Sequence, residues 1–545
     1  MPDPVPVTAR RAPWHAWSDR TRQVVGAMAL GLAAFAACEV LLIGRPLNRF
    51  DEAWMLWVGA RLARGDVLYR DVYDVSTPIA AWLVGLGEWI FGTHLVVTRT
   101  LSSAVFATEV VLACSVGRAF GAGRVTRGGI ALALLAFASP VVVFVNLYSA
   151  IAVLGGLVAF RSIVGWLAHR DDLDRHRARV ALAATAAGIA VAFWSKPNLG
   201  GFFGLAVVAV VVVAGARRPR TRILVDGAWL AAVFAVIAVP FVVAIAATGA
   251  WSSFVGQVFL SKGQYVDVGF SYFSSLQRRV DDLIGGGPHG DLRAVVPLLT
   301  GVAPIAFVLC TLVGAWRARR SGDLRVVAAV GFVVAGLLGV LPRPGANHVA
   351  GTMPVTLAAA VGLWALVPMG SGKATLVARR VVAAALVVVV AFAAVVVVAD
   401  GLDATFGHHH RWSAPFAPAE GRRSDEAAMA RLRRGLERHT DGTVFIARED
   451  GGYLYLITGT RNPLPYDIVE RSDLGSAGVV GLIGRLRRGD ARFVCIHPPF
   501  PDGSARNPLH ATRLDRWVRD RFTPVASLPS CDLYAAPPSK VRLIS

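Results

Sequence analysis

Apolar runs of about 20 residues, separated by clusters of arginine, constrain this chain more than any other feature of its sequence. A helix of that length is long enough to cross the hydrocarbon core of a bilayer. The composition agrees, because 55% of the residues are hydrophobic and the mean hydropathy is +0.54, whereas soluble domains are roughly 45–50% apolar. The sequence therefore predicts a polytopic α-helical membrane protein.

The arginine clusters predict how the chain crosses the membrane. Lysine and arginine favour the cytoplasmic side, so the N-terminus and the arginine-rich connections are expected there. The short connections on the other side carry one lysine or arginine or none, which agrees with this orientation. Dispersed arginines also explain the net charge of +20, so nucleic-acid binding is not expected. About 11 spans result, over residues 24–44, 95–117, 128–146, 150–168, 180–194, 200–216, 223–247, 294–316, 326–341, 349–369 and 381–399.

The sequence divides into a membrane part, residues 1–400, and a C-terminal part, residues 401–545, of ordinary soluble composition. The orientation places this second part outside the cytoplasm. Its apolar patterns predict a small α/β domain, with helices over residues 424–439, 476–488 and 513–521 and buried strands over residues 442–447 and 491–496. Residue usage rich in alanine, valine and arginine but poor in lysine is compatible with a high-GC bacterium, so the expected location is the bacterial plasma (inner) membrane.

Five cysteines are present, and none forms a Cys-x-x-Cys motif, which argues against a zinc ribbon or a redox motif. Cys495 and Cys531 both belong to the C-terminal part. A disulfide between them can form if this domain lies outside the cytoplasm, although the sequence alone does not show that they lie close together.

Two adjacent carboxylates, Asp51 and Glu52, follow the first span after a few residues and are expected at the membrane surface. The stretch 53–64 is amphipathic, and its aromatic residues suit a helix lying in the membrane interface. The apolar run 79–91 is too short to cross and is expected in the interface as well. The first outer loop, residues 45–94, is thus predicted to carry interfacial helices. An ordinary helix N-cap is the competing interpretation of Asp51.

A set of short motifs surrounds this acidic pair. They are Phe50-Asp51-Glu52-Ala53, Gly65 to Tyr69 with Arg70-Asp71, Thr77-Pro78, Phe91-Gly92, Arg99-Thr100-Leu101-Ser102 and a weaker Asn347-His348. Together they resemble the polytopic glycosyltransferases of the C superfamily (GT-C), in the branch of protein O-mannosyltransferases and aminoarabinose–lipid A transferases. The resemblance covers residues 45–105 best, and the later spans by architecture. One departure is Ser76, where the aminoarabinose branch usually carries a basic residue, so the same phosphate contact and the same substrate are not implied.

The resemblance implies a glycosyltransferase that moves a sugar from a polyprenyl-phosphate donor to a hydroxyl at the outer membrane face. Asp51 is expected to be the base that takes the proton of the acceptor hydroxyl, and Glu52 a supporting acid. A single base predicts one displacement with inversion, because retention needs two carboxylates flanking one bond. The sugar and the acceptor, whether lipid, glycan or protein, stay open.

Further residues at the same membrane face are candidates for binding the substrates. Lys196, Arg343 and His348 are expected to meet the leaving phosphate, although a lysine at a helix end and two ordinary turn residues are equally valid interpretations. Asp71 is expected to bind substrate hydroxyls or a divalent cation such as Mg²⁺ or Mn²⁺. Arg99, early in the second span, is costly there unless it is paired, and we expect it to pair with a loop acid.

Two other functions compete with this one. A transporter or flippase would place ionisable groups near the bilayer centre on broken helices, whereas here the acids gather at the surface, with Glu39 and Glu109 as exceptions. A non-catalytic cell-envelope assembly protein would act through its C-terminal part. In that protein Asp51→Asn would be harmless and deletion of the C-terminal part would not.

Overall fold

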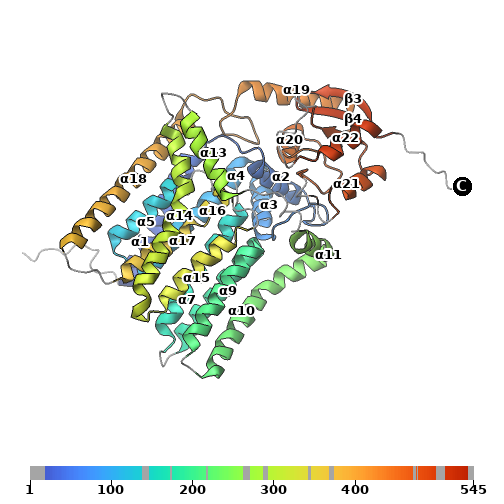
Figure 1. Cartoon of the computed structure of the whole chain (residues 1–545). Helices are drawn as coiled ribbons and strands as arrows, with labels where there is room; N and C mark the ends of the chain where they lie inside the picture. Colours follow the sequence, from blue (N-terminus) through green and yellow to red (C-terminus); the bar gives the residue numbers. More distant parts are fainter. Residues whose placement is uncertain are drawn as a thin grey trace, which may run out of the picture.

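The computed structural model consists of a bundle of long helices and a small mixed α/β domain next to one end of the bundle (Figure 1). The predicted fold class is confirmed. The structure describes residues 19–137, 147–171, 175–216, 219–261, 271–285, 292–341, 345–367, 373–470, 474, 477–498 and 510–537.

Each predicted span coincides with a helix of the bundle. These helices are α1 (Asp19–Leu42), α4 (Leu95–Ala119), α5 (Arg124–Phe137), α7 (Leu147–His169), α8 (Arg175–Ser195), α9 (Pro197–Gly215), α10 (Arg220–Ala247), α14 (Leu292–Ala318), α15 (Arg325–Leu338), α17 (Met353–Leu366) and α18 (Lys373–Phe406). Among the described residues, eight helices are long and apolar enough to cross a membrane. The helices α5, α15 and α17 have 14 residues each and are shorter than that; the predicted end of the third span, residues 138–146, lies outside the described residues.

The surface of the bundle is apolar where a soluble protein would be polar. On α10, at the edge of the bundle in Figure 1, Leu224 and Val236 are 71% and 73% exposed. Large exposed apolar surfaces mark contact with another apolar phase. The protein is therefore an integral membrane protein, and α10 is a helix that faces lipid.

Inside the bundle, α7 and α8 approach closely because each presents a glycine to the other. A Cβ atom at Gly155 would come within 2.5 Å of the carbonyl oxygen of Gly188, and a Cβ atom at Gly188 would come equally close to Gly155. Small residues at such contacts let membrane helices pack backbone against backbone. This contact fixes the start of α7 beside the end of α8, which matters for the site described below.

Two helices fill the connection between α1 and α4: α2 (Asp51–Ala63) and α3 (Ile79–Phe91). On α3, Ala80, Ala81 and Val84 are buried, whereas Trp89 and Phe91 are 71% and 69% exposed. An exposed apolar face suits a short helix at a membrane interface. Trp57 on α2, in contrast, is buried. Its ring is 3% exposed, because the C-terminal domain covers this helix.

The remaining connections of the membrane part contain short elements. They are α11 (Trp251–Val255), the π-helical turn η2 (Gly256–Leu260), α13 (Tyr272–Gly285), the 3-10 turn η3 (Arg319–Ser321) and α16 (Ala346–Ala350).

The C-terminal domain is built on a four-stranded sheet in the order β1-β2-β4-β3, in which β1 and β2 are parallel and the other pairs antiparallel. Its elements are α19 (Arg423–His439), β1 (Phe445–Ile446), α20 (Gly451–Thr458), α21 (Gly478–Arg487), β2 (Phe493–Ile496), α22 (Thr512–Arg521), β3 (Thr523–Leu528) and β4 (Cys531–Ala535). Alternate strand residues point to opposite faces. Phe445 and Val494 therefore pack with α21 and α22, whereas Ile446 and Cys495 pack with α19, α20 and α2.

The two cysteines of this domain form a disulfide. Cys495 on β2 and Cys531 on β4 lie on neighbouring strands with their Cα atoms 5.5 Å apart, within the usual range for a disulfide. The sequence left this pairing open, and the structure joins the two residues.

A buried ionic cluster lies where the two parallel strands end. Glu449 follows β1 and His497 follows β2. The ring of His510 lies between two acids, with Nε2 2.8 Å from Asp515 Oδ2 and Nδ1 3.4 Å from Glu449 Oε2. Burial alone would lower the pKa of His510, but its hydrogen bonds with both acids raise that pKa to about 9. Burial alone would raise the pKa of Glu449, but hydrogen bonding to His510 lowers it to about 2.

The stability of the C-terminal domain is therefore expected to decrease at alkaline pH and at acidic pH. The contribution of protonated His510 is complete below its ordinary pKa of 6.5 and is lost as the pH rises through about 9. The contribution of ionised Glu449 is complete above its ordinary pKa of 4.5 and is lost as the pH falls through about 2. Hydrogen exchange of β2 amides, corrected for the intrinsic rate at each pH, measures this. The His510→Gln variant should lose the alkaline dependence, and an unchanged alkaline limb would contradict the assignment.

Candidate active site

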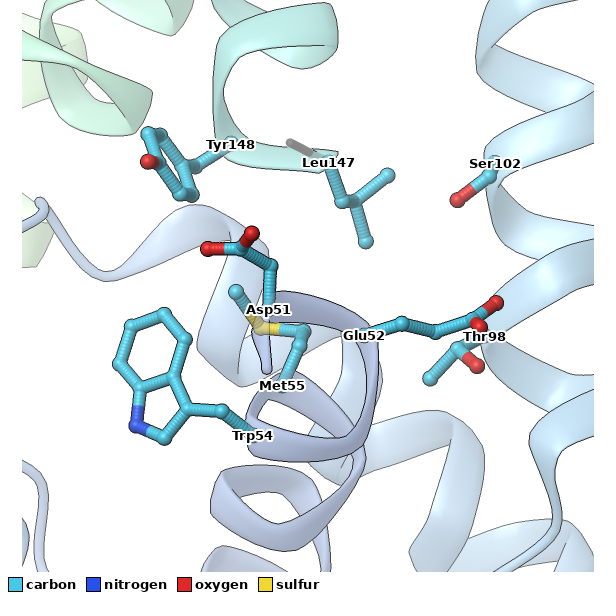
Figure 2. A pocket seen from close by; sticks show the side chains of 8 residues that line it. All are labelled: Asp51, Glu52, Trp54, Met55, Thr98, Ser102, Leu147 and Tyr148. Atoms are coloured by element: carbon cyan, nitrogen blue, oxygen red, sulfur yellow. The ribbon is translucent and has the colours of Figure 1, made fainter. Parts of the chain in front are cut away.

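Asp51 is the first residue of α2 and lies in a hollow where three parts of the chain meet. The hollow is lined by Asp51, Glu52, Trp54, Met55, Thr98, Ser102, Leu147 and Tyr148 (Figure 2). The carboxylate of Asp51 points toward the ring of Tyr148, at the start of α7. The helix N-terminus carries partial positive charge, which favours the ionised form of a carboxylate there. Asp51 thus lies in a hollow at one end of the bundle.

Glu52 points away from Asp51, because neighbouring residues on a helix are about 100° apart. Its carboxylate is held by Arg99 of α4, with Oε1 2.8 Å from Nε and Oε2 2.9 Å from Nη2. Both side chains are almost fully buried, at 3% and 1% exposure. Arg99 also donates to the carbonyls at the end of α1, which are those of Leu42, Ile43 and Arg45. The predicted pairing of Arg99 with a loop acid is confirmed, and that acid is Glu52.

The hollow beside Asp51 is small. Its volume is about 10 Å³, which is close to the space that one water molecule needs. A hydroxyl group fits beside the carboxylate, whereas a whole sugar ring does not. The hollow as described is therefore smaller than a sugar ring.

Lys196 lies close to Tyr148. It lies between α8 and α9, where its Nζ donates to Ser149 Oγ at 3.1 Å and lies 5.5 Å from the centre of the Tyr148 ring. Asn198, two residues later, donates to the carbonyls of Gly339 and Leu341 at the end of α15. The structure therefore brings one predicted cation, Lys196, to the same end of the bundle as Asp51.

Asp71 does not line this hollow. Asp71 pairs with Arg70 at 2.9 Å and accepts a hydrogen bond from the Val67 amide at 2.8 Å. The hydrogen bond from Arg70 holds the pKa of Asp71 below its usual value. The backbone carbonyl of Asp71 accepts a hydrogen bond from Arg61. Arg61 is ten residues after Asp51 on α2, so the two lie about 15 Å apart along the helix.

Two further predicted site residues are His348 and Arg343. His348 lies on α16, which packs against α13 and α14, and it does not line the described hollow. Arg343 lies outside the described residues, so its place at the site stays a prediction.

The described side chains do not fit the divalent cation considered above. No group of three or more histidine, cysteine or acidic side chains among them could hold a metal ion. Asp51 and Glu52 diverge, and Glu52 is held by Arg99.

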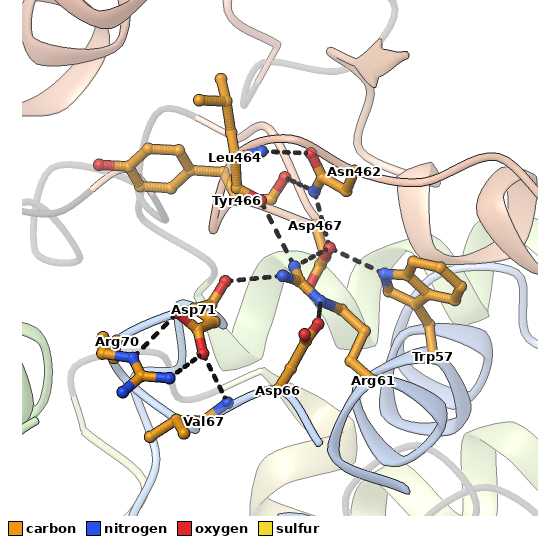
Figure 3. A network of polar contacts seen from close by, with 10 residues as sticks. All are labelled: Trp57, Arg61, Asp66, Val67, Arg70, Asp71, Asn462, Leu464, Tyr466 and Asp467. Carbon is orange, nitrogen blue, oxygen red and sulfur yellow. Dashed lines mark hydrogen bonds and ion pairs between the residues drawn. The ribbon is translucent and has the colours of Figure 1, made fainter. Parts of the chain in front are cut away.

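The C-terminal domain fixes the other end of α2 through a buried polar network (Figure 3). Asp467 accepts hydrogen bonds from Trp57 Nε1 at 2.8 Å, from Arg61 Nη1 at 2.9 Å and from Asn462 Nδ2 at 2.8 Å. The ring of Trp57 also stacks on Tyr455 of α20, with centroids 5.0 Å apart. The domain and the helix that begins with Asp51 thus share one core.

With this geometry described, the chain can be compared with known proteins. No protein-family model matches the sequence, and no curated protein matches it either. Solved structures do match. The chain resembles ArnT from Cupriavidus metallidurans bound to undecaprenyl phosphate with a TM-score of 0.59 and 16% identity, over 95% of this chain and 99% of that one. The apo state of the same protein gives a TM-score of 0.55 and 15% identity, over 96% and 100% of the two chains.

A third match is the oligosaccharyltransferase of Archaeoglobus fulgidus in the apo form, with a TM-score of 0.52 and 11% identity over 86% of this chain and 69% of that one. These structures are GT-C glycosyltransferases. This chain has the GT-C fold. Because the match to ArnT covers nearly the full length of both chains, the GT-C likeness includes the C-terminal domain as well as the bundle.

Within this GT-C fold, the sequence did not single out Tyr148 or the network around Asp467. Tyr148 lies in an apolar stretch with no acidic or basic neighbour, so it carries no separate signal. Arg61 and Asp467 are 406 positions apart, and neither residue has a pattern that identifies its partner. Gly452 of α20 lies where the two parts meet, because a Cβ atom there would come within 2.8 Å of Trp54 Cα. The glycine is a feature of the sequence that agrees with this close approach of α20 to α2.

Proposed function

We propose that the protein is a membrane glycosyltransferase that transfers a sugar from a polyprenyl-phosphate donor to a hydroxyl acceptor. The observation that carries this proposal is the carboxylate of Asp51, directed into a hydroxyl-sized hollow that also contacts Tyr148, within a GT-C fold. The ArnT structure that matches this chain holds undecaprenyl phosphate, which supports a lipid of the same class here. The orientation proposed from the arginine pattern places this end of the bundle outside the cytoplasm.

The proposed reaction is one displacement. Asp51 accepts the proton of the acceptor hydroxyl as its oxygen forms a bond to the anomeric carbon of the sugar. The bond from that carbon to the phosphate oxygen breaks, and the polyprenyl phosphate leaves with the bonding electrons. The ammonium of Lys196 is proposed to balance the charge of this phosphate. Attack opposite the leaving group inverts the anomeric configuration.

Glu52 takes a different part in this proposal from the one that the sequence favoured. Its two oxygens are both occupied by Arg99, so it holds α2 against α1 and α4. We infer that Glu52 is a positioning residue that sets the place of Asp51, and that it exchanges no proton with the substrate.

The function can be tested by giving the purified full chain, in lipid nanodiscs, a panel of polyprenyl-phosphate sugars and extracts of cell-envelope glycans and proteins. Transfer releases polyprenyl phosphate and adds the mass of one sugar to an acceptor, and mass spectrometry detects both. A flippase would move the lipid between leaflets without releasing polyprenyl phosphate, and that result would overturn the proposal. Mass spectrometry of envelope glycans from cells with and without the protein then identifies the acceptor.

Lys196→Gln is expected to weaken the binding of undecaprenyl phosphate about tenfold, because a charge-assisted hydrogen bond contributes roughly 1.5–3 kcal/mol. Lys196→Arg keeps the charge and should retain most of the affinity. Titration of the lipid into nanodiscs, followed by Trp fluorescence, measures the dissociation constant. Equal affinity of the Gln variant and the unaltered chain would show that Lys196 only ends a helix.

A further inference from the structure

A second hollow lies at the opposite end of α7 from Asp51. Its volume is about 570 Å³, within the roughly 300–1,000 Å³ of small-ligand sites. Because α7 has 23 residues, the two hollows are separated by roughly 30 Å along the helix. The hollow therefore lies at the other face of the membrane, where the ends of α4 and α7 meet the start of α15.

Arg161 contributes a half-buried charge to this hollow, and no acid among the described residues pairs with it. It lies eight residues before the end of α7 and so about 12 Å inside that end. Its Nε donates to Ser115 Oγ of α4 at 3.0 Å. In the part of the chain that the structure describes, Arg161 takes part in no ion pair. A cation so placed in a spanning helix is costly unless an anion or water meets it.

Two further arginines line the same hollow. Arg170 approaches Asp171 through Nε at 3.3 Å, but its Nη1 is buried and has no hydrogen-bond partner among the described residues. Arg325 is the exception, because Asp323 accepts from it at 2.6–3.0 Å. Asp323, the one acid among the described residues that line the hollow, is thus already paired, and among these residues the guanidinium groups of Arg161 and Arg170 have donors left for a ligand.

Apart from these charged groups and His169, the lining residues are apolar or glycine, with Val164, Leu167 and Leu324 among them. A soluble anion gains nothing from these side chains, whereas the glycerol and upper acyl carbons of a lipid do. Basic pockets between membrane helices are suited to anionic lipid headgroups. We propose that this hollow is a binding site for the phosphodiester headgroup of an anionic phospholipid, held by Arg161 and Arg170 at the arginine-rich face of the bundle.

Thermal unfolding of the detergent-purified full chain tests this site without any assay of sugar transfer. Added dioleoyl phosphatidylglycerol should raise the midpoint temperature by about 2 °C or more, because a ligand that binds the folded state stabilises it. Dioleoyl phosphatidylcholine, with the same chains but no net charge, should not. Added salt should reduce the shift in midpoint temperature, because salt screens the attraction between the headgroup and the arginines where they are exposed to solvent.

The double variant R161Q/R170Q should lose most of the shift. The matched control is R319Q/R320Q, which removes the same charge from exposed positions on η3 that do not line the hollow, and it should keep the shift. If the first double variant does not fold, R170Q alone serves, because this side chain lies at the helix end and is 21% exposed.

Three results would overturn the proposal. Equal stabilisation by phosphatidylcholine would exclude recognition of charge. An equal shift with inorganic phosphate alone would assign the site to a soluble anion. An unchanged shift in R161Q/R170Q would place the lipid elsewhere.

Discussion

Asp51→Asn is expected to reduce sugar transfer at least a hundredfold while the protein stays folded. The amide has the shape of the carboxylate but cannot accept the proton of the acceptor hydroxyl, and a positioned general base contributes roughly 10²–10⁴-fold to the rate. Asparagine has nearly the same size as aspartate, so the replacement is expected to leave the packing around the first turn of α2 unchanged. The measurement is the single-turnover release of polyprenyl phosphate at saturating donor, together with the thermal unfolding midpoint.

Asp71→Asn provides the comparison for this prediction. Both aspartates lie in the first outer loop, but the carboxylate of Asp71 pairs with Arg70 at the other end of α2. The loss of transfer in Asp71→Asn should be much smaller than in Asp51→Asn. Unchanged turnover in Asp51→Asn, or the reverse order of the two variants, would remove Asp51 from its proposed role.

The helices of the bundle could be predicted from the sequence because length and hydropathy are local properties. The predicted run 95–117 is α4 (Leu95–Ala119), and the predicted run 223–247 is α10 (Arg220–Ala247). In the C-terminal domain, the predicted helix 424–439 is α19 (Arg423–His439). The strands β3 and β4 were missed, because β3 is largely exposed and its residues, Thr-Pro-Val-Ala-Ser-Leu, lack the continuous apolar pattern of a buried strand.

Only those features of the site that depend on residues adjacent in the sequence could be predicted. Two adjacent acids after a span predict carboxylates at a membrane surface, but not that Asp51 and Glu52 point in different directions. The burial of Trp57 by the C-terminal domain could not be predicted for the same reason. An aromatic residue on an amphipathic helix suits lipid or a protein surface equally, and its partner, Tyr455, is almost 400 positions later in the chain. Contacts between distant segments decide such cases.

The buried pair of Glu52 and Arg99 gives the second large expected effect, on stability. Glu52→Leu leaves the guanidinium of Arg99 buried without its acid, and breaking a buried pair in this way costs about 3–5 kcal/mol. The thermal unfolding midpoint in detergent should fall steeply. Replacing both residues, as in E52L/R99M, is expected to recover part of this loss, because two apolar side chains of similar volume leave no unpaired charge. The recovery is incomplete, since Arg99 also binds the carbonyls at the end of α1.

The same double variant separates positioning from acid–base chemistry at Glu52. If Glu52 acts by holding α2, transfer by E52L/R99M should recover together with stability, and its dependence on pH should match that of the unaltered chain. If Glu52 exchanges a proton with the substrate, the double variant should regain its fold but remain inactive, with one limb of the pH profile missing. A double variant less stable than Glu52→Leu alone would show that the pair does not carry the burial cost argued here. Since Asp51 is the residue before Glu52 on α2, the place of the proposed base depends on this ion pair more directly than on any other described contact of the membrane part.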